Sequence, residues 1–201
     1  MYSIDYSIEN DLCKASQLVN NLEHSLHMAI SYAQTSPSDS THEYRLERLL
    51  VGQAVAAVRR LKALRLELSD LQQVELGNLM TIYNLTRFYN KERYAIAIET
   101  ELCVRMQIAR EGLENLISNS AATIDLDAVL MERTILQEMW NAFCEVSQPD
   151  PDKQQSVEEI DEQFKRLLPR KSDFRWVPSL RTVYPADDFW WLHHERATVA
   201  A

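Results

Sequence analysis

The chain has 201 residues, of which 46% are hydrophobic and 25% are charged. This composition is typical of a folded globular protein with a substantial core, and it excludes an intrinsically disordered chain. The net charge of −9 opposes broad, non-specific binding to nucleic acid or to anionic membranes.

Three features of the sequence bear on its location. The richest apolar run, LLVGQAVAAV at 49–58, is interrupted by Gln53 and falls short of the roughly 18 residues of a transmembrane helix. The amino terminus carries acids where a signal peptide has basic residues. Cys13, Cys103 and Cys144 are far apart, and we expect buried thiols in a reducing compartment. The sequence therefore predicts a cytoplasmic protein with no membrane-spanning segment.

Glycine and proline are scarce. The chain has three glycines, and no proline lies between Pro37 and Pro149. A β-rich protein of this size needs many more turn residues, whereas long helices with few loops do not. We therefore predict an all-α fold, an antiparallel bundle of about five helices.

Apolar residues in the first third recur at alternating spacings of four and three. This pattern predicts one helix over 8–33, a polar loop at 35–43 and a second helix whose apolar stripe runs from Leu50 to Leu71. The second stripe can be buried within the chain or against a second copy, and the spacing leaves both alternatives open.

The middle of the chain continues this pattern. The Gly-Asn pair in LGNL at 76–79 predicts a helix end, followed by a shorter helix over 79–89. Another helix is expected to start near Asn90. The polar stretch 118–127 predicts a loop in which Asp125 caps a helix that ends near residue 147.

Beyond Cys144 the composition changes. We expect a linker over 147–155, and SVEE at 156–159 has the form of a capping box for a short helix to about Leu168. The rest is rich in proline and aromatic residues and is predicted to be largely irregular, with a last helical turn from Asp187. We thus expect a helical bundle over 1–147, with 148–201 packed on it as part of the same structural domain.

The C-terminal segment carries an unusual share of large aromatic residues. Such side chains are costly to leave in water, so they either strap the protein's own core, which we favour, or bind a partner. Arginine and aromatic residues are also enriched at binding hot spots. The candidate partner-binding residues are Arg175, Trp176, Tyr184, Phe189, Trp190 and Trp191.

Basic residues gather at 45–65 and at 165–181, the second time among aromatic residues. Phosphate contacts and base stacking from such segments can hold single-stranded nucleic acid. The acidic stretch 149–162 opposes that field. The candidate residues for this alternative are Arg59, Arg60, Lys62, Arg65, Arg170 and Lys171.

His24 and His27 lie one helical turn apart, a spacing by which two imidazoles can share a metal ion. No second such pair supplies further ligands, so solvated surface histidines are the preferred interpretation. We expect no cofactor, because the chain lacks the glycine-rich phosphate loops, nucleophile elbow and zinc-protease motif of common enzyme families.

The leading hypothesis is therefore a non-catalytic cytoplasmic protein of the inhibitor, immunity, chaperone or adaptor type. It would bind an unidentified protein through a helical face and the C-terminal aromatic segment. A nucleic-acid-binding helical subunit is the alternative. A metal-dependent helical-bundle enzyme at His24 and His27 is a further one.

Overall fold

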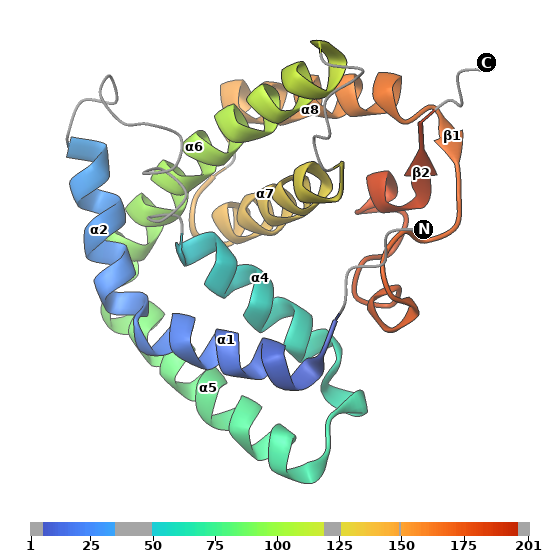
Figure 1. Cartoon of the computed structure of the whole chain (residues 1–201). Coiled ribbons are helices and arrows are strands. Elements are labelled where there is room, and N and C mark those ends of the chain that lie inside the picture. The colour runs from blue at the N-terminus through green and yellow to red at the C-terminus, as the bar shows by residue number, and fades with distance from the viewer. Residues whose placement is uncertain (1–5, 35–49, 119–125, 149, 197–201) are drawn as a thin grey trace. The chain divides into compact units, whose positions relative to one another are not determined.

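A computed structural model describes residues 6–34, 50–118, 126–148 and 150–196. Over these residues the fold is all-α, with seven α-helices and one pair of two-residue strands (Figure 1). The predicted fold class and the irregular C-terminal segment are confirmed. The described residues before 148 form six helices where five were expected, because the stripe assigned to one helix over 8–33 is divided in two. The seventh helix corresponds to the short one predicted to end near Leu168.

The chain forms two compact units that are not consecutive in sequence. The N-terminal unit comprises the described residues within 6–104 together with 138–148. The C-terminal unit comprises those within 105–137 together with 150–196. The long helices α6 (Lys91–Ser118) and α7 (Leu126–Val146) each contribute residues to both units.

The apolar stripe predicted for 8–33 is divided between α1 (Ile8–Asn20) and α2 (Leu22–Gln34). The side-chain amide of Asn21 donates to the carbonyl oxygen of Gln17 at 2.9 Å, which competes with regular helical hydrogen bonding. The stripe stays in phase across the break, since Val19 and Leu22 are both buried.

The predicted helix over 50–71 is too long. In the structure α4 (Leu50–Ala63) is followed by a 3₁₀ turn at Arg65–Glu67, and α5 (Asp70–Tyr89) is a separate helix. Ser69 starts α5 through a capping box, in which its hydroxyl accepts from the Gln72 backbone and its own backbone N–H donates to the Gln72 side chain at 3.0 Å.

The helix end predicted at 76–79 is wrong. Gly77 lies inside α5, and no glycine among the described residues has a positive φ. The predicted start of a helix near Asn90 and the end of a helix near residue 147 are confirmed by α6 and α7. The predicted loop at 35–43 and most of the one at 118–127, including Asp125, lie outside the described residues.

The amino terminus of α4 is held by a distant carboxylate. Glu101 on α6 is buried, and its two oxygens accept from the backbone N–H groups of Val51 and Gly52 at 3.0 and 2.9 Å. A carboxylate at this end also compensates the positive end of the helix dipole. No local sequence pattern indicates that Glu101, about fifty positions away, caps this helix.

In the C-terminal unit, α8 (Pro151–Leu167) starts earlier than predicted. Asp150 caps it and Pro151 occupies its first turn, whereas Ser156 lies inside the helix. The described residues beyond α8 are irregular apart from two 3₁₀ turns, Pro178–Leu180 and Trp190–His193, and the antiparallel strands β1 (Arg170–Lys171) and β2 (His194–Glu195).

Candidate protein-binding surfaces

Helix α5 is apolar on two opposite faces. One face is buried in the N-terminal unit through Leu76, Leu79 and Tyr83. At about 100° per residue, a second set of apolar side chains points the other way. We call this set the exposed face of α5. It consists of Leu71, Val74, Ile82, Leu85, Phe88 and Tyr89.

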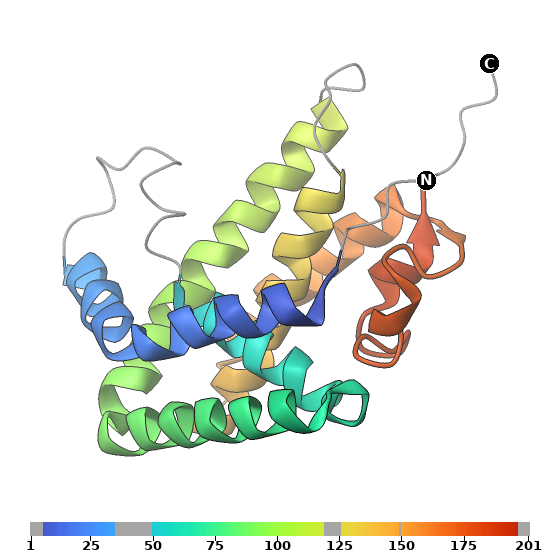
Figure 2. The same cartoon turned by 60° about the horizontal axis from the view of Figure 1, so that its bottom comes forward.

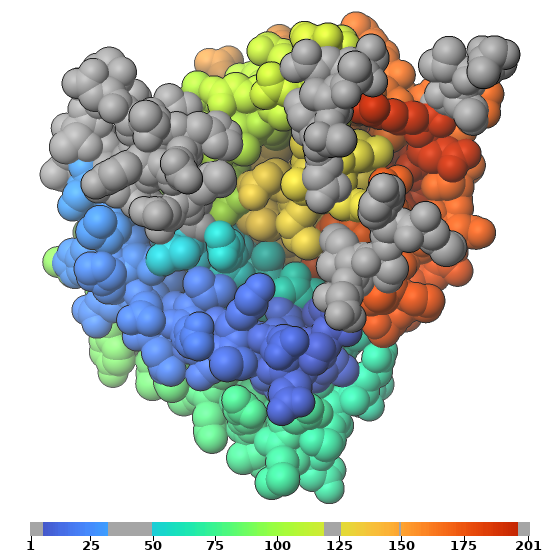
Figure 3. Space-filling model, in the orientation of Figure 1, coloured from blue at the N-terminus to red at the C-terminus, as the bar shows by residue number. Residues whose placement is uncertain are grey.

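The side chains of this face are open to solvent to an unusual extent. Their exposed fractions run from 42% for Ile82 to 84% for Leu71, with Phe88 and Tyr89 both above 75%. Helix α5 runs beside α1 in the cartoons of Figure 1 and Figure 2. In the space-filling view of Figure 3, the atoms of α5 emerge below those of α1. Three other large apolar residues in the described parts of the chain are comparably exposed: Leu66, Ile96 and Ile117.

A concentration of large exposed apolar side chains on one helix is typical of a surface that another molecule covers. Sequence reasoning missed this face because it placed Leu71 in the buried stripe of the preceding helix. That assignment is wrong, since the capping box at Ser69 starts a new helix with a new phase. The signal was present in Leu71, Val74, Leu85 and Phe88, whose spacings of three, eleven and three place them on one side of a helix.

Four of the six predicted partner-binding residues are buried in the C-terminal unit. Trp176, Tyr184, Phe189 and Trp191 have exposed fractions of 4% or less. Their rings meet edge to face, with centroids 5.3 Å apart for Trp176 and Tyr184 and 4.9 Å for Tyr184 and Phe189. This cluster gives the irregular segment a core of its own.

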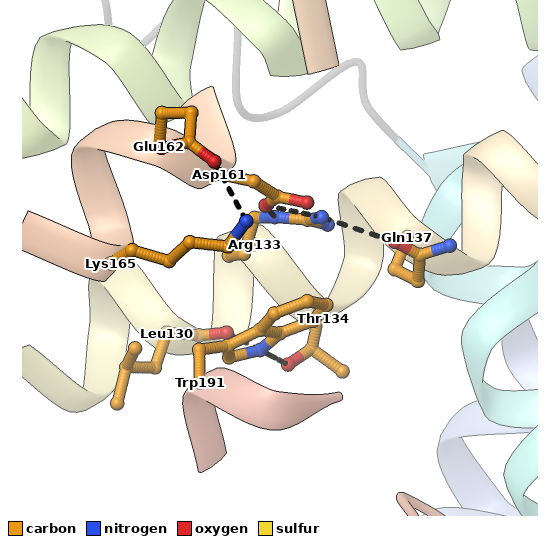
Figure 4. Close-up of polar contacts among 8 residues, drawn as sticks. All are labelled: Leu130, Arg133, Thr134, Gln137, Asp161, Glu162, Lys165 and Trp191. Carbon is orange, nitrogen blue, oxygen red and sulfur yellow. Dashed lines mark hydrogen bonds and ion pairs between the residues drawn. The ribbon is translucent and has the colours of Figure 1, made fainter. Parts of the chain in front are cut away.

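Trp191 anchors the segment to α7 (Figure 4). Its indole N–H donates to the hydroxyl of Thr134 at 3.1 Å, and the guanidinium of Arg133 lies 3.9 Å from the ring centre. Arg133 also donates to Asp161 on α8 and to Gln137 on α7. Three segments of the C-terminal unit are thereby joined through one buried arginine.

Burial sets the electrostatics of this pair. Removal from water lowers the pKa of Arg133, against the opposing effect of Asp161. Removal from water likewise raises the pKa of Asp161, although the neighbouring Arg133 lowers it. Both shifts disfavour the charged forms, so the pair depends on the two partners remaining together.

The other two predicted partner-binding residues are more accessible. Arg175 is half-buried and its Nε donates to the buried carboxylate of Asp127. Trp190 is also half-buried and stands edge to face with His194. Its side chain lines a shallow hollow of about 300 Å³. The other residues lining this hollow are Lys165, Leu168, Pro169 and His194.

The basic residues of the nucleic-acid alternative differ in their surroundings. Arg60 donates to the buried Asp11 at 2.7 Å, and Arg59 pairs with Glu138 and Glu145 on α7. The remaining four side chains are exposed: Lys62, Arg65, Arg170 and Lys171. The first two belong to the N-terminal unit and the last two to β1 in the C-terminal unit.

His24 and His27 are both exposed on α2. An arginine N–H of Arg93 lies 3.1 Å from Nε2 of His27. Because a guanidinium only donates, this ring nitrogen must accept. Within the described ranges, no three histidine, cysteine, aspartate or glutamate side chains gather closely enough to hold a metal ion.

The cysteines depart from expectation. Cys13, Cys103 and Cys144 lie at exposed positions and are not joined in disulfides, so the predicted burial of the thiols is wrong. Each cysteine lies on the solvent-facing side of its own helix. The prediction failed because it relied on cysteine being among the residue types most often buried. Among the described helices, none combines the length and apolar character needed to span a bilayer.

Comparison with known proteins gives no match. No family model, no curated protein and no solved structure is significantly similar to this chain.

Proposed function

We propose that this protein works by binding another protein chain, and that the exposed face of α5 is its principal contact surface. The observation that carries the proposal is the solvent exposure of six large apolar side chains along one helix. Complete burial of a large apolar side chain is worth about 1.5–3 kcal/mol. Six such residues supply enough to offset the several kcal/mol that association costs.

The composition of the face supports a protein partner. Phe88 and Tyr89 are of the type enriched in protein interfaces, and the face itself carries no charged side chain. A surface for nucleic acid needs cations directed at phosphates. Lys62, Arg65, Arg170 and Lys171 are the exposed members of the set predicted for such a role, and the net charge of −9 works against it.

The C-terminal segment has a supporting part in this proposal. Trp190 and Arg175 are the members of the predicted set whose side chains a partner can reach. The buried aromatic cluster would act by holding Trp190 in position. We place the protein in the cytoplasm, because a reducing compartment keeps exposed thiols such as Cys13, Cys103 and Cys144 from forming disulfides.

Chemical crosslinking of the tagged full-length chain in its native cell, followed by mass spectrometry, tests the proposal. The disruptive variant is L85E/F88E, and I117E is the matched control because Ile117 is an exposed apolar residue outside the face. We expect the chains crosslinked to the wild type, whether foreign proteins or second copies, to persist with I117E and to be lost with L85E/F88E. Retention of every crosslinked chain by a folded L85E/F88E variant would overturn the proposal.

A further inference from the structure

We propose that the exposed face of α5 binds the same face of a second copy of this chain, with the two helices antiparallel. This inference rests on the proposed function, since it names the partner of the same surface. It is carried by the spacing of the face, by its symmetry about the middle of the helix and by the distribution of charge along α5.

Six exposed positions of α5 alternate in spacings of three and four along the helix. They are Leu71, Val74, Asn78, Thr81, Leu85 and Phe88, and we call them the α5 seam. This is the repeat by which two helices pack along their length as a coiled coil. The seam therefore fits a helix as its occupant. Ile82 and Tyr89 widen it on one side.

The seam reads the same in both directions. From either end it runs apolar, apolar, polar, and then polar, apolar, apolar. Two antiparallel copies related by a two-fold axis at mid-helix would place Leu71 opposite Phe88, Val74 opposite Leu85 and Asn78 opposite Thr81 of the second copy. Every apolar side chain of the seam then meets an apolar one. Such self-complementarity is what a two-fold interface between identical chains requires.

The polar pair at the centre fixes the register. In the symmetric arrangement the amide of Asn78 can hydrogen-bond the hydroxyl of Thr81 in each half of the interface. A slip by one heptad would place Asn78 against Val74 or Phe88 of the second copy and leave the amide without a partner. An unpaired buried amide costs about 1–3 kcal/mol, so the slipped registers are disfavoured.

Charge favours the antiparallel orientation. The first half of α5 carries the exposed acids Asp70 and Glu75, whereas the second half carries no acid and has Arg87 in its last turn. A parallel pair would place the acids of one copy beside those of the other. An antiparallel pair instead places the acidic half of one copy beside the half of the other that carries no acid, and it opposes the two helix dipoles.

Molar mass in solution, measured by light scattering at micromolar concentration, tests the pairing. We expect the wild type and the I117E control to have twice the 23.4 kDa mass of one chain, and L85E/F88E to have that of one chain. A monomeric wild type overturns the second-copy proposal. If L85E/F88E still loses a foreign partner in the crosslinking experiment, the proposed function stands without it. A dimer that survives L85E/F88E also overturns the proposal.

Disulfide trapping tests the orientation. In a background with Cys13, Cys103 and Cys144 replaced by serine, N78C and T81C variants carrying different tags are mixed and oxidised. The antiparallel register places the two new cysteines within disulfide reach, so we expect the mixed dimer to crosslink well above either variant alone. Preferential crosslinking of N78C to itself would show parallel pairing and overturn the antiparallel arrangement.

Discussion

The guanidinium of Arg133 lies 3.9 Å from the ring centre of Trp191, and both side chains are almost completely buried. This contact joins α7 to the irregular C-terminal segment within one compact unit. It explains how a segment rich in proline and poor in regular hydrogen bonds keeps a defined structure.

We expect Arg133→Met to destabilise the protein by about 3 kcal/mol, because it leaves the carboxylate of Asp161 partly buried without its cation. Urea unfolding followed by circular dichroism measures the loss. The double variant R133M/D161L removes both charges, and we expect it to recover about half of the free energy of unfolding that Arg133→Met loses. Equal losses in the single and double variants would show that Asp161 does not need Arg133.

The effect of Arg133→Met should depend on pH. Burial already raises the pKa of Asp161, and removal of the arginine raises it further. The native state then binds a proton more readily than the unfolded chain, so stability rises as pH falls through the folded-state pKa. We expect the loss relative to wild type to be smaller at about pH 5 than at about pH 7. An equal loss at both would contradict this assignment.

The buried phenol of Tyr94 leads us to expect that the N-terminal unit loses stability at high pH. Its hydroxyl lies 3.0 Å from that of Tyr83, and burial raises the pKa of both phenols above the ordinary value of about 10. The unfolded chain ionises first, so the stability present below about pH 10 is lost above it. We expect Tyr94→Phe to cost about 1 kcal/mol at neutral pH and to lose less on alkalinisation than wild type. Identical alkaline slopes in urea unfolding would refute this.

Gly77→Ala tests the position of residue 77 inside α5. A Cβ atom there meets no other atom within 4 Å, and alanine is favoured over glycine in a helix interior by about 1 kcal/mol. We therefore expect the free energy of unfolding to rise by roughly that amount in the L85E/F88E background, where association does not contribute. Gly112→Ala is the matched control, because its Cβ would lie 3.3 Å from Val129 and should gain less. A destabilising Gly77→Ala would instead support a helix end at this residue.

The fold class followed from simple physical signals. Scarce glycine and proline with alternating apolar spacing indicate helices, and the buried apolar residues Leu12, Ala15 and Val19 of α1 lie on the predicted stripe. Helix α4 is buried more widely than predicted, because only Ala54, Ala57 and Leu61 of its eight buried residues lie on the predicted stripe. Helix boundaries were harder to predict, because a helix ends at Asn21 and another begins after Ser69 although the spacing of apolar residues in the sequence continues across both. Periodicity places an apolar face on a helix, but it does not say whether the same chain covers that face.

The candidate site illustrates this difference. The aromatic residues of the C-terminal segment were candidates for partner binding because they are large and close together in the sequence. Most of them are buried in the segment's own core. Leu71 was placed in a buried stripe and is exposed. The cap of α4 by Glu101 and the ion pair of Arg60 with Asp11 join residues about fifty positions apart, which no local pattern encodes.

The most direct test of the binding surface is hydroxyl-radical labelling of side chains, in the cell and in dilute purified protein. Phe88 and Tyr89 are the reporters, and Ile117 is the internal reference. A protein chain seated on α5 predicts that labelling of Phe88 and Tyr89 is much weaker in the cell, while labelling of Ile117 is the same in both samples. Equal labelling of all three residues in both samples would contradict it.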